Sequence, residues 1–186
     1  MRPTEQLKEE HKAIKLMLRI LDRVCEKLES GEEVNLEHLE KIVEFIKVFA
    51  DKCHHGKEED LLFPAMEEAG IPKEGGPIGV MLTEHNLGRN YVKDLSDAVT
   101  KYKAGDRQVA SKIVENARNY VGLLTPHINK EDNILYMMAD MHLSKERQEK
   151  LLEEFEKVEH EIIGAGRHEE FHQLLHNLEE VYIKDS

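Results

Sequence analysis

Hydrophobic residues recur every three or four positions along most of the chain, which is the spacing of the buried face of an α-helix. The clearest example lies near the start of the chain, where the inward positions are separated alternately by four and by three residues: Leu7, His11, Ile14, Leu18, Leu21, Cys25 and Leu28. This pattern stops at Ser30 and Gly31, a pair typical of a helix C-terminus. We therefore predict a long amphipathic helix that ends before Ser30.

Three further long segments repeat this period, and turn residues separate them. The second segment begins after Asn35, a good N-cap residue, and Pro64 is expected to break or kink it before a loop rich in glycine and proline. The third extends from about Pro77 to Gly105, and the fourth contains Pro126, where we expect a kink. Four long helices joined by short loops predict an up-down-up-down four-helix bundle.

Two shorter amphipathic segments follow the fourth helix. Ser144 is suited to cap the first of them, and a Gly-Ala-Gly stretch at residues 164–166 separates it from the second. No segment has the pattern of a strand. We therefore expect an all-α protein in two parts: a four-helix bundle over residues 1–141, and a C-terminal helical hairpin over residues 142–186 that packs on the bundle.

Composition narrows the class of protein. The chain has 186 residues, enough to bury a core, and its 38 acidic and 26 basic side chains leave a formal net charge of −12. This acidic balance argues against a nucleic-acid partner. No apolar run approaches the length of about 20 residues that crosses a bilayer, and the first residues lack the apolar core of a signal peptide. We expect a cytoplasmic protein without membrane contact, whose protein partners and oligomeric state stay open.

Histidine placement carries the candidate chemistry. The chain contains 11 histidines, and each of the four long stripes has one of them at an inward position: His11, His54, His85 and His127. A single inward histidine is more often a core residue with hydrogen-bond partners than a ligand. Four of them in one bundle each need partners for both ring nitrogens, and a shared metal centre satisfies one nitrogen of each.

Two of these helices add a carboxylate one turn after the histidine, at Glu58 and Glu131. The two segments also resemble each other, HHGKEEDLLF beside HINKEDNILY, and this alignment favours His54 with Glu58 over the overlapping pair His55 with Glu59. A single histidine followed four residues later by a glutamate is usually a hydrogen-bonded pair on the surface of a helix. Four imidazoles with two carboxylates instead suit two adjacent divalent ions, and the ligand types leave iron, zinc and manganese open.

The chain resembles hemerythrin-like (HHE cation-binding) domain proteins over residues 5–141. Four segments carry this resemblance: EEH at 9–11, HHGKEEDLLFP at 54–64, TEHNLGR at 83–89 and HINKEDNILY at 127–136. The resemblance implies a centre of two non-heme iron ions inside the bundle, bridged by an oxo or hydroxo group and by the carboxylates of Glu58 and Glu131. It also implies two imidazoles for each iron: His11 and His54 for one, and His85 and His127 for the other.

One ligand of the family pattern is missing. Hemerythrins that bind O2 reversibly use five histidines, and two of these lie one turn apart on the third helix. In this chain the position one turn before His85 is Met81. His55 is the nearest replacement, because some family members place a ligand directly after the histidine of the second helix. The alternative is that His55 faces a neighbouring helix or solvent.

These features lead to one functional hypothesis and two alternatives. We expect a non-heme di-iron protein that binds O2 or a related small ligand, such as NO or peroxide, for sensing, storage or delivery. Because a missing imidazole leaves more open positions, the first alternative is a di-iron enzyme that consumes peroxide or NO or repairs iron centres. The second alternative is a structural module that holds zinc or no metal, which explains the four inward histidines poorly.

Overall fold

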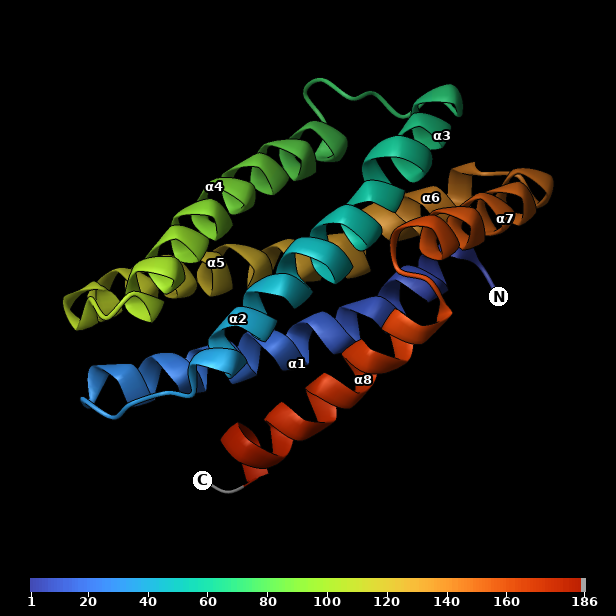
Figure 1. Cartoon of the computed structure of the whole chain (residues 1–186). Helices are drawn as coiled ribbons and strands as arrows, with labels where there is room; N and C mark the ends of the chain where they lie inside the picture. Colours follow the sequence, from blue (N-terminus) through green and yellow to red (C-terminus); the bar gives the residue numbers. More distant parts are fainter. Residues whose placement is uncertain (185–186) are drawn as a thin grey trace.

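The computed structural model describes residues 1–184, and within that range the chain forms helices and no strand (Figure 1). The all-α prediction is therefore confirmed. The first helix is α1 (Pro3–Glu29), and the second is continuous through four segments, α2 (Leu36–Phe45), η1 (Ile46–His55), η2 (Glu58–Leu62) and α3 (Phe63–Glu68). The third is α4 (Pro77–Lys103). After the short turn η3 (Arg107–Val109), the fourth comprises α5 (Ala110–Lys130), η4 (Glu131–Leu135) and α6 (Tyr136–His142).

The four long helices form the predicted bundle. Short connections reverse the chain direction after each helix, so neighbours along the chain are also neighbours in space, and α5 closes the bundle by packing on α1 (Figure 1). The Asn35 side chain caps α2 as expected, because its Oδ1 accepts the backbone N–H of Glu37 at 2.9 Å. None of the helices in the described residues has an apolar stretch long enough to cross a membrane.

Both prolines expected to disturb helices lie inside continuous ones. The second helix passes Pro64 and ends at Glu68, so the chain does not break there, and α5 continues through Pro126; the kinks expected at these two prolines stay predictions. The wider π-helical turns of η2 directly precede Pro64, where the missing N–H would otherwise interrupt the α-helical hydrogen-bond ladder.

Hydrophobic side chains form two separate core clusters, with a polar layer between them. The boundary is visible along each helix: in α1 it lies between Leu7 and Ile14, and in α4 between Met81 and Val92. His11 and His85 occupy these two intervals. The candidate site therefore lies in the interior of the bundle, with one apolar cluster on each side of it.

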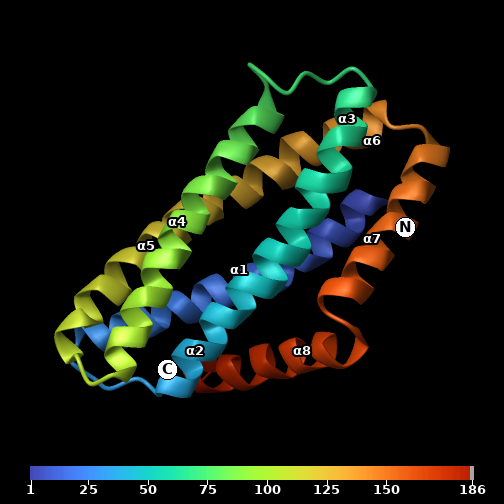
Figure 2. The ribbon, with the colours of Figure 1, turned by 45° about the horizontal axis from the view of Figure 1, so that its top comes forward.

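The C-terminal helices are α7 (Lys145–Ile162) and α8 (Ala165–Glu179), followed by η5 (Glu180–Lys184). They do not fold back on each other as the predicted hairpin. They meet at a corner and follow the same side of the bundle, where α7 packs on α1, η1 and η2, and α8 packs on α1 and α2 (Figures 1 and 2). Gly164 permits the corner with a φ of 74°.

The apolar stripe of each C-terminal helix packs on the bundle, which explains why no hairpin forms. Phe155 of α7 belongs to the smaller core cluster, and Phe171 of α8 belongs to the larger one. The division of the chain into parts at residues 141 and 142 stays a prediction, and the last two residues of the expected extension, 185 and 186, lie outside the described residues.

Replacing Phe155 by alanine tests whether α7 is an integral part of the core. The Phe155 ring is fully buried, and we expect its loss to lower the free energy of unfolding by about 3–5 kcal/mol in chemical denaturation. The control is the neighbouring exposed residue, Glu156→Ala, which should change stability by no more than about 0.5 kcal/mol. Equal stability of the two variants would show that α7 is dispensable.

Candidate metal centre

The polar layer contains all seven residues that the sequence proposed as metal ligands. All are buried, with at most 4% of any of them exposed, although they come from six different helical segments. They are His11 of α1, His54 and His55 of η1, Glu58 of η2, His85 of α4, His127 of α5 and Glu131 of η4.

Three segments of the site are π-helical, which explains how adjacent residues serve the same centre. In η1, η2 and η4 the backbone hydrogen bonds span five residues, and such widened turns are frequent at functional sites. In a regular α-helix, neighbouring side chains point about 100° apart. The wider turns of η1 bring both His54 and His55 into the interior.

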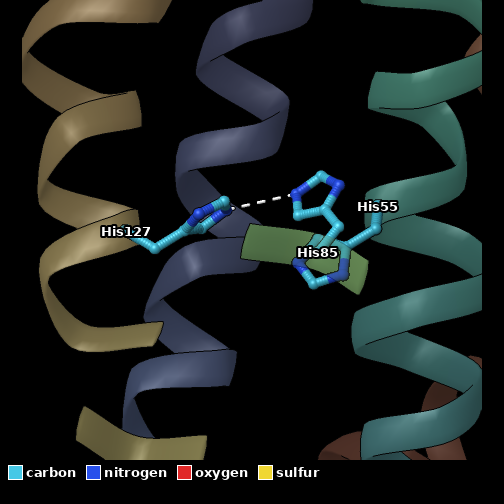
Figure 3. Close-up of side chains that lie close together, drawn as sticks. All are labelled: His55, His85 and His127. Atoms are coloured by element: carbon cyan, nitrogen blue, oxygen red, sulfur yellow. Dashed lines mark hydrogen bonds between the residues drawn. The ribbon is translucent and has the colours of Figure 1, made fainter. Parts of the chain in front are cut away.

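The imidazoles form two groups. In one group the Nε2 atoms of His11 and His54 lie 3.0 Å apart. In the other, the Nε2 atoms of His85 and His127 lie 3.2 Å apart, and the His55 ring stacks on that of His85 with 3.9 Å between their centres (Figure 3). His55 therefore faces the interior and joins the second group, as the metal-ligand alternative required.

The two glutamates lie between these groups. Glu58 Oε1 is 3.6 Å from His54 Nε2 and 3.5 Å from His85 Nε2. Glu131 Oε1 is 3.5 Å from His11 Nε2 and 2.9 Å from His127 Nε2. Each carboxylate thus faces one imidazole of each group, which is the arrangement that a pair of bridged ions needs.

Every one of the five imidazoles also has a carboxylate at its Nδ1 atom. A carboxylate at Nδ1 accepts the N–H there and leaves the lone pair of Nε2 for the interior. The Nδ1 to carboxylate distances are His11–Asp132 2.6 Å, His54–Glu10 2.8 Å, His55–Asp51 3.3 Å, His85–Glu59 2.8 Å and His127–Glu84 3.0 Å.

Four of these hydrogen bonds form a closed ring around the bundle. Each carboxylate comes from the helix that precedes its histidine in the chain, and the fourth helix closes the ring by supplying Asp132 to His11 of the first. His55 with Asp51 is the exception, because both lie on η1. The ring therefore ties all four helices together at the level of the site.

Basic side chains neutralise the outer carboxylates. Arg89 bonds both Asp51 and Glu59, at 2.9 Å and 2.5 Å. Lys57 is completely buried and reaches Glu10 at 2.5 Å. Two lysines complete the set: Lys130 lies 2.7 Å from Glu84, and Lys15 lies 3.5 Å from Asp132.

The electrostatics of the site favour a cation. Burial and the neighbouring Glu131 raise the pKa of Glu58 well above its usual range, and Tyr136 Oη donates a hydrogen bond to Glu58 Oε2 at 2.8 Å. Burial also acts to raise the pKa of Glu131, but its close contacts with Glu58, His11 and His127 outweigh that effect and lower the pKa. The pKa values of these two neighbouring carboxylates thus shift in opposite directions, and a cation between them would relieve their mutual repulsion.

The pKa values of the imidazoles shift in different directions according to their surroundings. Burial lowers the pKa of His54 to about 4 and that of His55 well below its usual value, so both are neutral at neutral pH, the form that binds metals. Burial acts in the same direction on His11 and His127, but the neighbouring carboxylates, which accept from these rings and attract their positive charge, outweigh it and raise their pKa.

The residues present fit divalent metal ions. Glu58 Oε1 and both carboxylate oxygens of Glu131 are buried and accept no hydrogen bond within the described residues, an expensive condition for polar atoms. Neighbouring ligand atoms at about 2.1 Å from one ion and about 90–110° apart lie about 3–3.5 Å from each other. The spacings of 2.9–3.6 Å between the inward nitrogen and oxygen atoms agree with this value.

Sequence reasoning missed most of the outer carboxylates. A signal was present, because four of the five carboxylates directly adjoin a candidate ligand in the chain: Glu10 and Glu84 precede His11 and His85, while Glu59 and Asp132 follow Glu58 and Glu131. Asp51 has no such signal. Which imidazole each one contacts depends on the packing of different helices.

Comparison with known proteins agrees with the site. Residues 2–139 match the model of the hemerythrin HHE cation binding domain family. Similar proteins include one from Mycobacterium bovis and two from Mycobacterium tuberculosis, each described as an uncharacterized protein and 26% identical over 162 residues. The match covers 87% of this chain, which spans 63% of the length of those relatives. No solved structure matches significantly. The family match covers most of the chain, and the chain belongs to the hemerythrin HHE cation-binding domain family.

Proposed function

We propose that this chain is a non-heme di-iron protein that binds O2 or a related small ligand, such as NO or peroxide, for sensing, storage or delivery. The observation that carries the proposal is the position of the two glutamates, each within 3.6 Å of one Nε2 atom from each imidazole group. We assign one ion to His11 and His54, the second to His55, His85 and His127, and the bridging role to Glu58 and Glu131.

The chain's own side chains prepare the site for this role. Ferrous ions held there would supply the electrons for binding or reducing O2. The outer carboxylates keep the Nε2 lone pairs turned inward, and one apolar cluster lies on each side of the site. Tyr136 holds its hydroxyl proton on Glu58 Oε2, next to His11 Nε2 at 3.4 Å. Imidazole with carboxylate suits iron, and metal analysis would distinguish iron from zinc or manganese.

A second candidate function is a di-iron enzyme that consumes peroxide or NO. Tyr136 favours it, because a buried phenol at 2.8 Å from a bridging carboxylate is a proton source at the centre. The two candidates share one ligand set and differ only in turnover.

His85→Ala tests the ligand assignment. His85 is placed to bind the second ion and contacts Glu58, so its loss should remove most of the bound metal. The measurement is metal content per chain after purification from iron-replete cells. His142→Ala is the control, because His142 is exposed and, within residues 1–184, its ring bonds only the backbone oxygen of Met138. Full metal content in His85→Ala would contradict the assignment.

Glu84→Gln tests the outer ring. The variant keeps the size of the side chain and removes the charge that holds His127 Nδ1, so we expect metal affinity to fall about 10–100-fold. Competition with a chelator measures the affinity. Asp94→Asn, an exposed change on the same helix, is the control and should leave affinity unchanged. Equal metal affinities of the two variants would show that Glu84 does not contribute to metal binding.

Air exposure separates binding from catalysis. For a binding protein, oxygenating the anaerobic reduced sample should change its visible spectrum, and deoxygenation should restore it. Steady consumption of peroxide or NO in the presence of a reductant would favour the enzyme instead. Glu58→Ala should abolish either behaviour, because it removes a bridging carboxylate. A wild-type protein that contains iron but shows neither response would contradict both functions.

A further inference from the structure

A cavity of about 340 Å³ lies beside the candidate centre, between η1, α4 and α5. Its lining includes His55 and His85, whose rings stack next to each other on the inner side of these helices (Figure 3). A molecule in this cavity therefore contacts two side chains that we assign to the second metal ion.

The cavity is larger than a diatomic ligand requires. A molecule such as O2 is close in size to a water, whose share of liquid volume is about 30 Å³. Small-molecule sites usually have volumes of about 300–1,000 Å³, and an apolar cavity of about 150 Å³ holds a benzene ring. The space of about 340 Å³ therefore suits a small organic molecule of about one ring with a polar substituent.

Tyr120 supplies an unpartnered hydrogen-bond donor to this cavity. Only 2% of Tyr120 is exposed, yet its hydroxyl has no hydrogen-bond partner within residues 1–184. The hydroxyl oxygen is not one of the fully enclosed atoms that lack a partner, so it keeps some accessible surface, and Tyr120 lines the cavity from which a ligand can reach it. Burial raises the pKa of Tyr120, and the charges that act on it belong to Asp51 and Arg89, which also line the cavity. The hydroxyl is therefore a protonated donor near the cavity wall.

Cationic side chains add further donors. Lys47 Nζ donates only to the Ser96 hydroxyl, at 2.8 Å, and Lys93 has no partner in the part of the chain that the structure describes. Arg89 is already held by Asp51 and Glu59. Asp97 is then the only acidic side chain of the lining without a basic partner in the described residues. The cavity lining therefore offers more free hydrogen-bond donors than free acceptors, which favours an anionic ligand.

We propose that the cavity binds a small organic carboxylate of about the size of benzoate. Its oxygen atoms accept hydrogen bonds from Tyr120 and the lysines, and its apolar body packs on Val92 and Leu124. The ligand's place beside a metal ion rests on the proposed function, whereas its binding depends only on the cavity. The protein thus takes an organic acid next to the centre, in addition to a diatomic ligand.

Benzoate is the probe for this proposal, and benzyl alcohol is its neutral counterpart. Ligand-observed NMR and calorimetric titration of the protein as purified measure binding, and metal content is determined on the same samples. We expect benzoate to bind with a Kd below about 1 mM and benzyl alcohol to bind at least about 10-fold more weakly, because it lacks the charge.

Two variants test the location. Tyr120→Phe removes only the hydroxyl and should weaken benzoate binding about 10-fold without lowering Tm, because that hydroxyl has no partner to lose. Gly88→Ala narrows the cavity. The added methyl group would meet Tyr120, Leu123 and Leu124 at 3.6–3.8 Å, an ordinary contact, so the helix should gain stability while benzoate binding falls.

The matched control is Tyr91→Phe. Tyr91 lies on α4 and does not line the cavity, so this change should leave binding unchanged. Absence of benzoate binding in a protein that contains its metal would overturn the carboxylate site and leave the proposed function intact. Equal benzoate affinity in Tyr120→Phe, Gly88→Ala and wild type would also overturn it. Benzoate binding to a protein that contains no iron would contradict the proposed function alone.

Discussion

Two fully buried glutamates at the centre of the bundle impose the constraint on which the rest of the structure depends. Glu58 and Glu131 have no exposed surface, and three of their oxygen atoms accept no hydrogen bond within the described residues. Burying carboxylates without compensation is costly, so positive charge has to be available beside them. The surrounding imidazoles mark where that charge is held, and the apolar core has to divide around them.

Charge alternates outward from this point, and each shell compensates the one inside it. The inner carboxylates face imidazole Nε2 atoms, the imidazole Nδ1 atoms face outer carboxylates, and basic side chains contact those carboxylates in turn. The chain His54, Glu10 and Lys57 shows the principle, because it reaches Glu159 of α7 at 3.8 Å. The C-terminal extension therefore completes the surroundings of a buried lysine that serves the centre.

The predictable part of the molecule is the part that depends on periodicity within one helix. Amphipathic stripes identified the helices, and the repeated offset between His54 and Glu58 and between His127 and Glu131 selected most of the site residues. The status of His55 could not be predicted this way, because a regular helix directs adjacent residues about 100° apart. The π-helical turns of η1 remove that restriction, and no pattern of residues in the sequence predicted these turns.

The amino-acid sequence by itself determined which helices form and which of their faces are buried, because burial follows from the spacing of residues along one helix. Tertiary structure alone decided which carboxylate orients which imidazole, that His55 joins the second group, and that α7 and α8 follow the bundle without forming a hairpin. It also placed Tyr120 beside a cavity next to the site. Each of these outcomes depends on contacts between residues of different helices or on local widening of one helix, and a one-dimensional pattern contains neither.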